Sequence, residues 1–166
     1  MNDSSHTILI PYQPSWKDKF EVEKIKIKDI FGDKAIAVEH IGSTSIPGLS
    51  AKPIIDIAVM IENHKEADVF TGLLDKINYR FDSFSTERHF YTKGDPIEYH
   101  LSIAYKDKGG FWERQILFRD YLRNHSDLRG EYQKLKEDLL KNDPTGKDMY
   151  ISGKTEFIKK ILDLCK

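Results

Sequence analysis

The sequence has little of what secreted and membrane-spanning proteins usually carry. Its 166 residues include one cysteine, Cys165, so no disulfide can form within the chain, and this suits a reducing compartment. No apolar run approaches the ~18 residues that a bilayer span needs. The first seven residues are polar and lack the apolar core of a signal peptide. These absences predict a soluble, cytoplasmic protein.

The chain also lacks an excess of either charge. It has 26 basic and 27 acidic residues, for a formal net charge of −1. There is therefore no overall field that would attract nucleic acid or an anionic membrane, and we expect neither as a partner. Basic residues can still gather locally. The length suits one domain over residues 1–166, with a core of useful size.

What is present is an alternation of strand-like and helix-like patterns. It predicts a sheet part over about residues 1–108 and a helical part over about 109–166. The expected strands are 35–41, 54–61, 79–84, 88–93 and 97–105; the expected helices are 15–31, 64–77, 111–123, 131–141 and 148–164. Ser15 is expected to cap the first helix, and Val69 to lie on the buried side of the second. The fold class is α+β: a small mixed sheet with helices packed on one face and a C-terminal helical group.

The central stretch, residues 40–59, reads HIGSTSIPGLSAKPIIDIAV. Small residues on a turn expose backbone N–H groups that suit phosphate oxygens, and we assign this role to Gly42, Ser43, Thr44 and Ser45. Asp56 lies within an apolar strand, where a carboxylate needs a cation or another partner. The pattern predicts a phosphate cradle beside a carboxylate that binds Mg²⁺. The alternatives are a purely structural turn, a cap by Ser45, and an ion pair of Asp56 with a basic residue.

A resemblance to a known superfamily adds to this interpretation. Ile41-Gly42-Ser43 followed by Asp56-Ile57 resembles the hydrophobic-Gly-Gly/Ser and acidic patterns of nucleotidyltransferases. The longer run KPIIDI, from Lys52 to Ile57, resembles the GrpB-like family (glutamate-rich protein B). Further similarity covers nearly the whole chain: Pro11-Tyr12, Trp16, Phe118 to Arg123, Tyr132, Leu135-Lys136, Tyr150, Lys154 and Phe157-Ile158. The resemblance implies a nucleotidyltransferase-like fold.

The same resemblance implies a function and an alternative to it. The implied function is Mg²⁺-dependent transfer of a nucleotidyl group from a nucleoside triphosphate to an acceptor. However, Ala58 stands two residues after Asp56, where a metal-dependent transferase carries a second acid. This departure favours a catalytically reduced protein that binds a nucleotide or phosphorylated metabolite without turning it over. A third interpretation is a structural protein whose polar pocket is only a salt-bridge network.

Strand alternation adds two candidates to the site. Glu98 and His100 share one face of the strand expected over 97–105, and we expect both beside Asp56. Glu98 is the predicted second Mg²⁺ ligand, and all three residues are predicted catalytic groups. The alternatives are a solvent-exposed Glu98, and a transition-metal site in which His40 and His100 join Asp56.

Basic residues on the C-terminal helices complete the predicted site. Lys136 and Lys154 interrupt apolar stripes, and Arg119 follows Phe118 directly. A cation on a core-facing stripe either extends to water or meets an anion. Three on successive helices predict a shared acidic partner: either the acids of the sheet or a bound triphosphate. The predicted phosphate-binding basic residues are Lys52, Arg88, Arg119, Lys136 and Lys154.

Overall fold

A computed structural model describes residues 7–166, so the expectation of no signal peptide, made for residues 1–7, lies outside the described residues for all but the last of these seven. The α-helices are α1 (Ser15–Phe31), α2 (Thr71–Asp75), α3 (Phe111–Asn124), α4 (Ser126–Asn142) and α5 (Asp148–Leu164). The strands are β1 (Ala37–Ile41), β2 (Ile55–Ile61), β3 (Arg80–Phe84), β4 (Arg88–Lys93) and β5 (Tyr99–Tyr105). Short 3₁₀ helices occupy Gly32–Lys34, Ser43–Ser45 and His64–Phe70. In the described part of the chain, none of these helices has the length and apolar character to cross a membrane.

The five strands form one mixed sheet in the order β1-β2-β5-β4-β3. The central strands β2 and β5 run parallel, and every other neighbouring pair is antiparallel. In this register Asp56 of β2 is paired with His100 of β5. Because directly paired residues point to the same side of a sheet, the two side chains share a face. Two residues that are 44 positions apart in sequence thus become neighbours.

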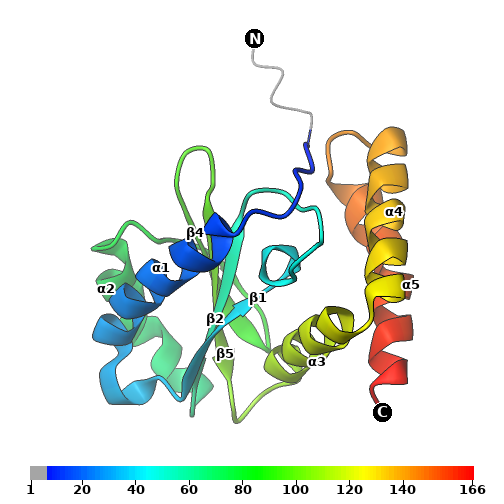
Figure 1. The fold of residues 1–166 in the computed structure, drawn as a ribbon. Helices are drawn as coiled ribbons and strands as arrows, with labels where there is room; N and C mark the ends of the chain where they lie inside the picture. Colours follow the sequence, from blue (N-terminus) through cyan, green and yellow to red (C-terminus); the bar gives the residue numbers. More distant parts are fainter. Residues whose placement is uncertain (1–6) are drawn as a thin grey trace.

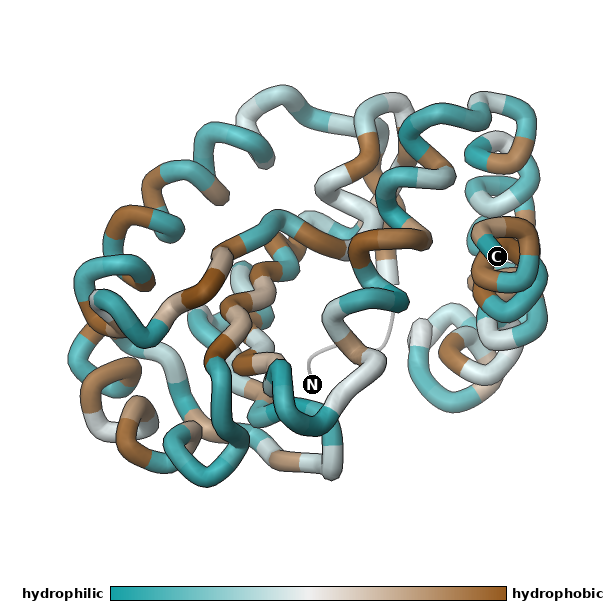
Figure 2. The backbone as a smooth tube through the Cα atoms, turned by 90° about the horizontal axis from the view of Figure 1, so that it is seen from below, coloured by the Kyte–Doolittle hydropathy of each residue, from teal (hydrophilic) through white to brown (hydrophobic). Residues whose placement is uncertain are grey.

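The two faces of the sheet differ in chemistry. Helices α1 and α2 cover one face (Figure 1), where the large hydrophobic core includes Leu101 and Ile103, as the alternation of β5 predicts. The other face carries a small apolar cluster of Ile41, Ala58, Ala104 and Phe111, next to the polar residues of β2 and β5. Figure 2 shows hydrophobic residues concentrated in the central strands, while the helices alternate between hydrophobic and hydrophilic positions. The face that carries the polar residues of β2 and β5 can therefore hold a functional site.

The C-terminal helices pack on one another and on the loop after β1. Leu122 of α3, Tyr132 of α4 and Ile161 of α5 form a buried cluster with Ile46 and Leu49 of that loop. In Figure 1 these helices stand on the side of the sheet opposite α1 and α2. The apolar contacts fix the Gly42–Ser45 turn between the sheet and the helical group. The predicted α+β fold, a mixed sheet with a C-terminal helical group, is confirmed.

Two local predictions are wrong. Pro14 already has helical dihedral angles and no side chain caps α1, so Ser15 lies inside the first turn instead of capping it. The segment predicted as a helix over 64–77 begins as a seven-residue 3₁₀ helix and continues as the short α2. With three residues per turn, Ala67 and Phe70 share the buried face. Val69 is therefore turned outward and is 69% exposed.

Candidate active site

The carboxylate of Asp56 lies against the backbone of Gly42, at the end of β1. A Cβ atom on residue 42 would lie only 3.0 Å from Cγ of Asp56. Gly42 also has φ 72° and ψ −175°, a conformation essentially limited to glycine. The glycine is needed both for the turn and for the close approach of the acid. The structure thus brings the predicted acid and the predicted turn together.

Two of the turn's hydroxyls hold the turn itself. Thr44 Oγ1 donates to the carbonyl of Ile54 at 3.2 Å and lies 2.9 Å from Nε2 of His40. Burial lowers the pKa of His40 to about 4, so the ring is neutral. Because Thr44 gives its single hydroxyl proton to Ile54, we assign Nε2–H of His40 as the donor to Thr44. Ser45 Oγ donates to the carbonyl of Gly42. The hydroxyls of Thr44 and Ser45 are therefore used internally, as a structural turn requires.

His100 is the nearest hydrogen-bonding partner of Asp56. Its Nδ1 lies 3.0 Å from Oδ1 of Asp56, and both side chains are about one-third exposed, 31% and 32%. The ring of Phe90 meets the imidazole edge-to-face at a centroid distance of 5.0 Å. The imidazole is thus held by Asp56 and by the ring of Phe90, and both members of the pair remain accessible to a ligand in the pocket. The prediction that these two residues converge is confirmed in geometry.

Glu98 does not join them, so the expected convergence of Glu98 with Asp56 is wrong. The residue precedes β5, which begins at Tyr99, and its backbone carbonyl accepts from the N–H of Ile55. Its side chain is exposed and lines a separate hollow at the β4–β5 hairpin, together with Lys93. Alternation counted back from His100 fails here because the extended strand has already ended.

The proposed two-histidine metal site is not assembled either. His100 lines the pocket with Asp56, whereas His40 lies on the other side of the turn with its Nε2 engaged by Thr44. Across residues 7–166, no group of three or more His, Cys, Asp or Glu side chains is placed to hold a metal ion. The alternative of a transition-metal site that joins both histidines to Asp56 is therefore wrong.

Lys136 of α4 reaches the turn from the helical group. Its Nζ donates to Oγ of Ser43 at 3.1 Å and to the carbonyl of Ser50 at 2.7 Å. The side chain is almost fully buried, with 1% exposed. Burial, together with the positive charges of Lys154 and Lys52, lowers the pKa of Lys136 to about 7. A lysine on the apolar stripe of α4 is thus directed into a polar pocket, as its position predicted.

Two more lysines face the same pocket across an aromatic ring. Nζ of Lys52 and Nζ of Lys154 lie 4.8 Å and 4.4 Å from the ring centroid of Tyr150. Burial lowers the pKa of Lys154 to about 8, with the charge of Lys52 adding to the effect and Asp56 opposing it. Burial also lowers the pKa of Lys52, again against Asp56. Lys52 donates to the carbonyl of Gly146, while Lys154 has no hydrogen-bond or ion-pair partner among the described residues.

Arg88 of β4 supplies a fourth cation. Its guanidinium lies between the rings of Phe90 and Phe111, 4.6 Å and 4.7 Å from their centroids, and donates to Oγ of Ser102 at 2.8 Å. Burial lowers the pKa of Arg88, and the charge of Asp56 is the main effect opposing it. Sandwiched in this way, the guanidinium keeps its charge while its position is fixed.

These side chains line one pocket of about 420 Å³ between the sheet and helices α4 and α5. Its charged lining residues are Lys52, Asp56, Arg88, Lys136 and Lys154. Four cations thus surround one carboxylate. Burial is the main cause of the lowered lysine pKa values, and repulsion between the positive groups adds to it for Lys136 and Lys154. A phosphate group placed among them would remove this repulsion.

A metal ion held by the protein alone does not fit this pocket. Asp56 is the single carboxylate, and the pattern's second acid is replaced by Ala58, which is fully buried in the small apolar cluster. Mg²⁺ is commonly held by one or two carboxylates together with phosphates of a ligand. The residues present therefore fit only a Mg²⁺ ion that Asp56 shares with the phosphates of a bound ligand.

The structure places two other predicted residues in a neighbouring pocket. Arg119 and Ser45 line a hollow between α1 and α3, and Arg119 pairs with Glu39 at 2.7 Å. The expected contribution of Arg119 to the Asp56 site is therefore wrong. Sequence reasoning in turn missed the role of Tyr150 as the ring that two lysines share. Its position four residues before Lys154 on one helical stripe was the available signal.

Comparison with known proteins settles the family. A model of the GrpB protein family matches residues 6–164. The chain belongs to the GrpB family. A relative from Bacillus subtilis (strain 168), UPF0157 protein YqkA, is 36% identical over 153 residues, which cover 91% of this chain and 45% of the relative. The chain thus spans less than half the length of that relative.

Solved structures agree with this membership. The crystal structure of the conserved protein GrpB from Enterococcus faecalis has a TM-score of 0.84 and 35% identity, covering 95% of this chain and 96% of that chain. Cid1 poly(U) polymerase, in a structure described as Mg 3′-dATP bound, has a TM-score of 0.52 and 14% identity over 76% of this chain and 41% of that chain. The second likeness shows the fold alone. This chain thus has a nucleotidyltransferase-like fold, as the sequence predicted.

Proposed function

We propose that this chain binds a nucleoside triphosphate or another phosphorylated small molecule in the pocket that contains Asp56. One observation carries the proposal: Lys52, Lys136, Lys154 and Arg88 converge on a space that holds one acid. An internal salt-bridge network would match charges more evenly. Clustered cations with depressed lysine pKa values are instead typical of a site prepared for an anion.

The four cations would contribute to phosphate binding in two different ways. Lys136 and Arg88 are held by hydrogen bonds within the protein, so they would act mainly through their fixed positive charge. Lys154 has no such partner among residues 7–166, and Lys52 makes one hydrogen bond, 3.3 Å long, to a backbone carbonyl. These two ammonium groups are therefore free to donate to phosphate oxygens.

A second candidate function is Mg²⁺-dependent nucleotidyl transfer. The observation that favours it is the Asp56–His100 pair set against Gly42, on a fold that is also that of Cid1 poly(U) polymerase. An acceptor oxygen would attack the α-phosphorus. The bond between the α-phosphorus and the oxygen that bridges it to the β-phosphorus would break, and pyrophosphate would leave. The acceptor's proton would pass to His100 or Asp56. Mg²⁺ shared with the phosphates would supply charge neutralisation.

Calorimetric titration with each nucleoside triphosphate, with and without Mg²⁺, tests both functions. Lys154→Met should weaken binding by about tenfold, because it removes a cation that can face the ligand. Lys159→Met is the matched control, since Lys159 is exposed on the same helix and lies outside the pocket. If the two variants bind with equal affinity, the lysine cluster does not contact the ligand.

Asp56→Asn separates the two candidates. It should abolish any gain in affinity that Mg²⁺ provides, while binding without Mg²⁺ persists or strengthens because a negative charge is gone. Pyrophosphate release from wild type, and its loss in Asp56→Asn, would support transfer; binding without release would support the binding protein alone. If no triphosphate binds wild type at millimolar concentration, the transfer proposal fails. If inorganic phosphate and pyrophosphate do not bind either, the binding proposal fails too and the salt-bridge network is favoured.

A further inference from the structure

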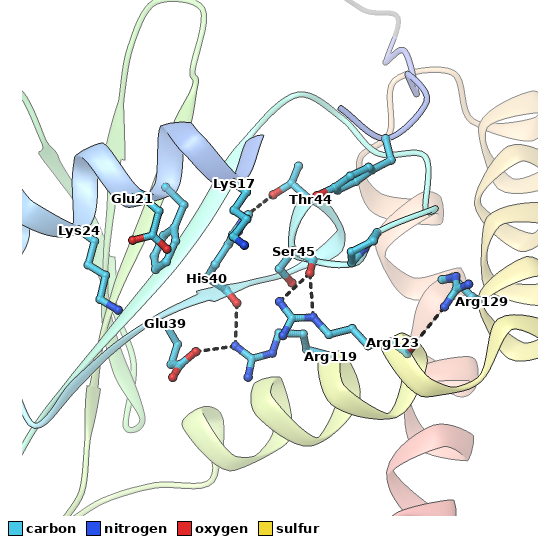
Figure 3. A pocket seen from close by; sticks show the side chains of 13 residues that line it. Lys17, Glu21, Lys24, Glu39, His40, Thr44, Ser45, Arg119, Arg123 and Arg129 are labelled. Atoms are coloured by element: carbon cyan, nitrogen blue, oxygen red, sulfur yellow. Dashed lines mark hydrogen bonds and ion pairs between the residues drawn. The ribbon is translucent and has the colours of Figure 1, made fainter. Parts of the chain in front are cut away.

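A second basic pocket lies on the other side of the Gly42–Ser45 turn, with a volume of about 620 Å³. Figure 3 shows Lys17 and Lys24 extending from α1, Arg119 and Arg123 from α3, and Arg129 from α4 around this space. These five basic side chains face two acidic ones, Glu21 and Glu39, among the lining residues. The size is within the range of small-molecule sites.

The guanidinium groups here are not all neutralised. Arg119 is fully paired, because it contacts Glu39 at 2.7 Å and Asp120 at 2.9 Å. Arg123 instead donates from Nε and Nη2 to the backbone carbonyl of Ser45, at 2.9 Å and 2.8 Å. A carbonyl is a neutral acceptor, so this bond fixes the guanidinium without cancelling its charge. Arg123 does form one long ion pair, 3.8 Å from Nη1 to Asp120, but it shares that carboxylate with Arg119, which lies closer at 2.9 Å.

Arg129 also donates to backbone carbonyls, and in its case the carbonyls lie at the C-terminal end of a helix. Its Nη1 donates to the carbonyls of Leu122 and Arg123, at 3.0 Å and 3.2 Å. These carbonyls belong to the last turn of α3, where a cation is favoured by the helix dipole. The dipole explains why the side chain is held there. The C-terminal end of a helix carries only about half a negative elementary charge, so part of the positive charge of Arg129 still faces the pocket.

The lysines of α1 complete the positive lining. Lys17 has no hydrogen-bond or ion-pair partner within residues 7–166, and Lys24 lies over the ring of Phe20 at 5.6 Å from its centroid. Phe20 in turn stacks on His40, with ring centroids 4.9 Å apart. Tyr12 also lines the space. Unpaired cations thus lie beside flat apolar surfaces, which suits a ligand with a phosphate and an aromatic or apolar part.

We propose that this pocket binds a second, phosphorylated small molecule, through the side chains of Lys17, Lys24, Arg123 and Arg129. It shares Thr44 with the Asp56 pocket but none of that pocket's cations. The two sites would therefore bind their ligands through separate charges on the two sides of one turn. This inference stands on the second pocket's own contacts and does not require the first site to be occupied.

An NMR titration with inorganic pyrophosphate and with a nucleoside monophosphate tests the proposal. Backbone amide signals of α1 and α3 should shift in a saturable way, separately from signals of α5 beside Lys154. The double variant Lys17→Gln/Lys24→Gln should weaken the α1–α3 response by about tenfold and leave the α5 response unchanged. Both lysines lack acidic partners in the described chain, so the variant should stay folded.

The matched control is Lys19→Gln/Lys28→Gln, which removes the same charge from exposed positions of α1 outside the pocket. Its α1–α3 response should match wild type. Equal weakening in both double variants would show a diffuse charge effect and overturn the site. The site would also be overturned if wild type showed no saturable shift in α1 and α3. Tighter binding of a single-stranded oligonucleotide than of either small phosphate at this pocket would overturn the assignment to a small molecule.

Discussion

Asp56 and Gly42 fit together so closely that residue 42 has no room for a side chain. A Cβ atom there would lie 3.0 Å from both Cβ and Cγ of Asp56, and the backbone angles of Gly42 are themselves restricted to glycine. The contact places the carboxylate against the turn and leaves its other side to His100. The position of Asp56 therefore depends on two things: the strand β2 that carries it, and the absence of a side chain at residue 42.

Gly42→Ala should therefore destabilise the protein and disturb the site. Backbone strain in this region costs about 1–3 kcal/mol, and contact with the carboxylate adds to it. Urea unfolding followed by circular dichroism measures the free energy of unfolding. Gly130→Ala is the control, because Gly130 lies within α4 and a Cβ there would meet nothing within 4 Å. That control should be stabilised by about 0.5–1 kcal/mol; a Gly42→Ala protein as stable as wild type would contradict the steric argument.

Lys154→Met should raise the stability of the free protein at pH 7, by about 1 kcal/mol or more. Burial lowers the pKa of Lys154 to about 8 from 10.5, so below pH 8 the folded state holds a charge that it disfavours. Between pH 8 and 10.5 the unfolded state binds more protons, so wild-type stability should rise with pH. In the variant this rise should be smaller. Lys159→Met should show wild-type stability and slope, and a loss of stability in Lys154→Met would show a structural role for the ammonium group.

Phosphate binding at pH 8 should take up protons. The pKa values of Lys136 and Lys154, about 7 and about 8, leave both groups partly neutral at that pH. A phosphate anion favours their charged forms and raises both pKa values. Calorimetric titrations in buffers of different ionisation enthalpy give the number of protons taken up. We expect net uptake in wild type and less in Lys154→Met; proton release in wild type would contradict the role of these lysines.

Restoring the second acid of the nucleotidyltransferase pattern should fail. Ala58 is fully buried beside Ile41, Ala104 and Phe111. The hydroxyl of Ser102, its neighbour on β5, already accepts a hydrogen bond from Arg88. Ala58→Asp should therefore destabilise the fold by more than about 3 kcal/mol instead of creating a metal site. Ala58→Ser, which adds a small neutral hydroxyl, should cost about 1–3 kcal/mol. Thermal melting with and without Mg²⁺ checks both; a Mg²⁺-stabilised Ala58→Asp protein would show that the reduced site can be restored.

Several parts of the site follow from local patterns alone. The glycine-hydroxyl run and the acid in an apolar strand place Gly42 and Asp56 at a turn and on β2. The stripes of α4 and α5 identify Lys136 and Lys154, because a cation at an apolar position needs an explanation. Alternation in β5 puts His100 on the polar face. In each case the period of one element is enough to fix which way the side chain points.

Other parts depend on where elements end and on which elements meet. Glu98 was expected on the face of His100, but β5 begins one residue later and the side chain turns to the hairpin. Arg119 was expected with the other cations of the helical group, yet α3 directs it to Glu39 of β1. The pocket between α1 and α3 could not be predicted from the sequence, because its cations come from three helices, of which α1 lies on the opposite side of the sheet from α3 and α4.

The sequence by itself determined the element types, the family, and the residues around Asp56 that carry unusual chemistry. It could do so because each of these depends on neighbours within a few positions along the chain. Only the tertiary structure decided that four cations surround one carboxylate and that Ala58 is enclosed by apolar side chains. It also divided the basic residues between two pockets. Such groupings depend on long-range packing of helices against the sheet, and no local period encodes that packing.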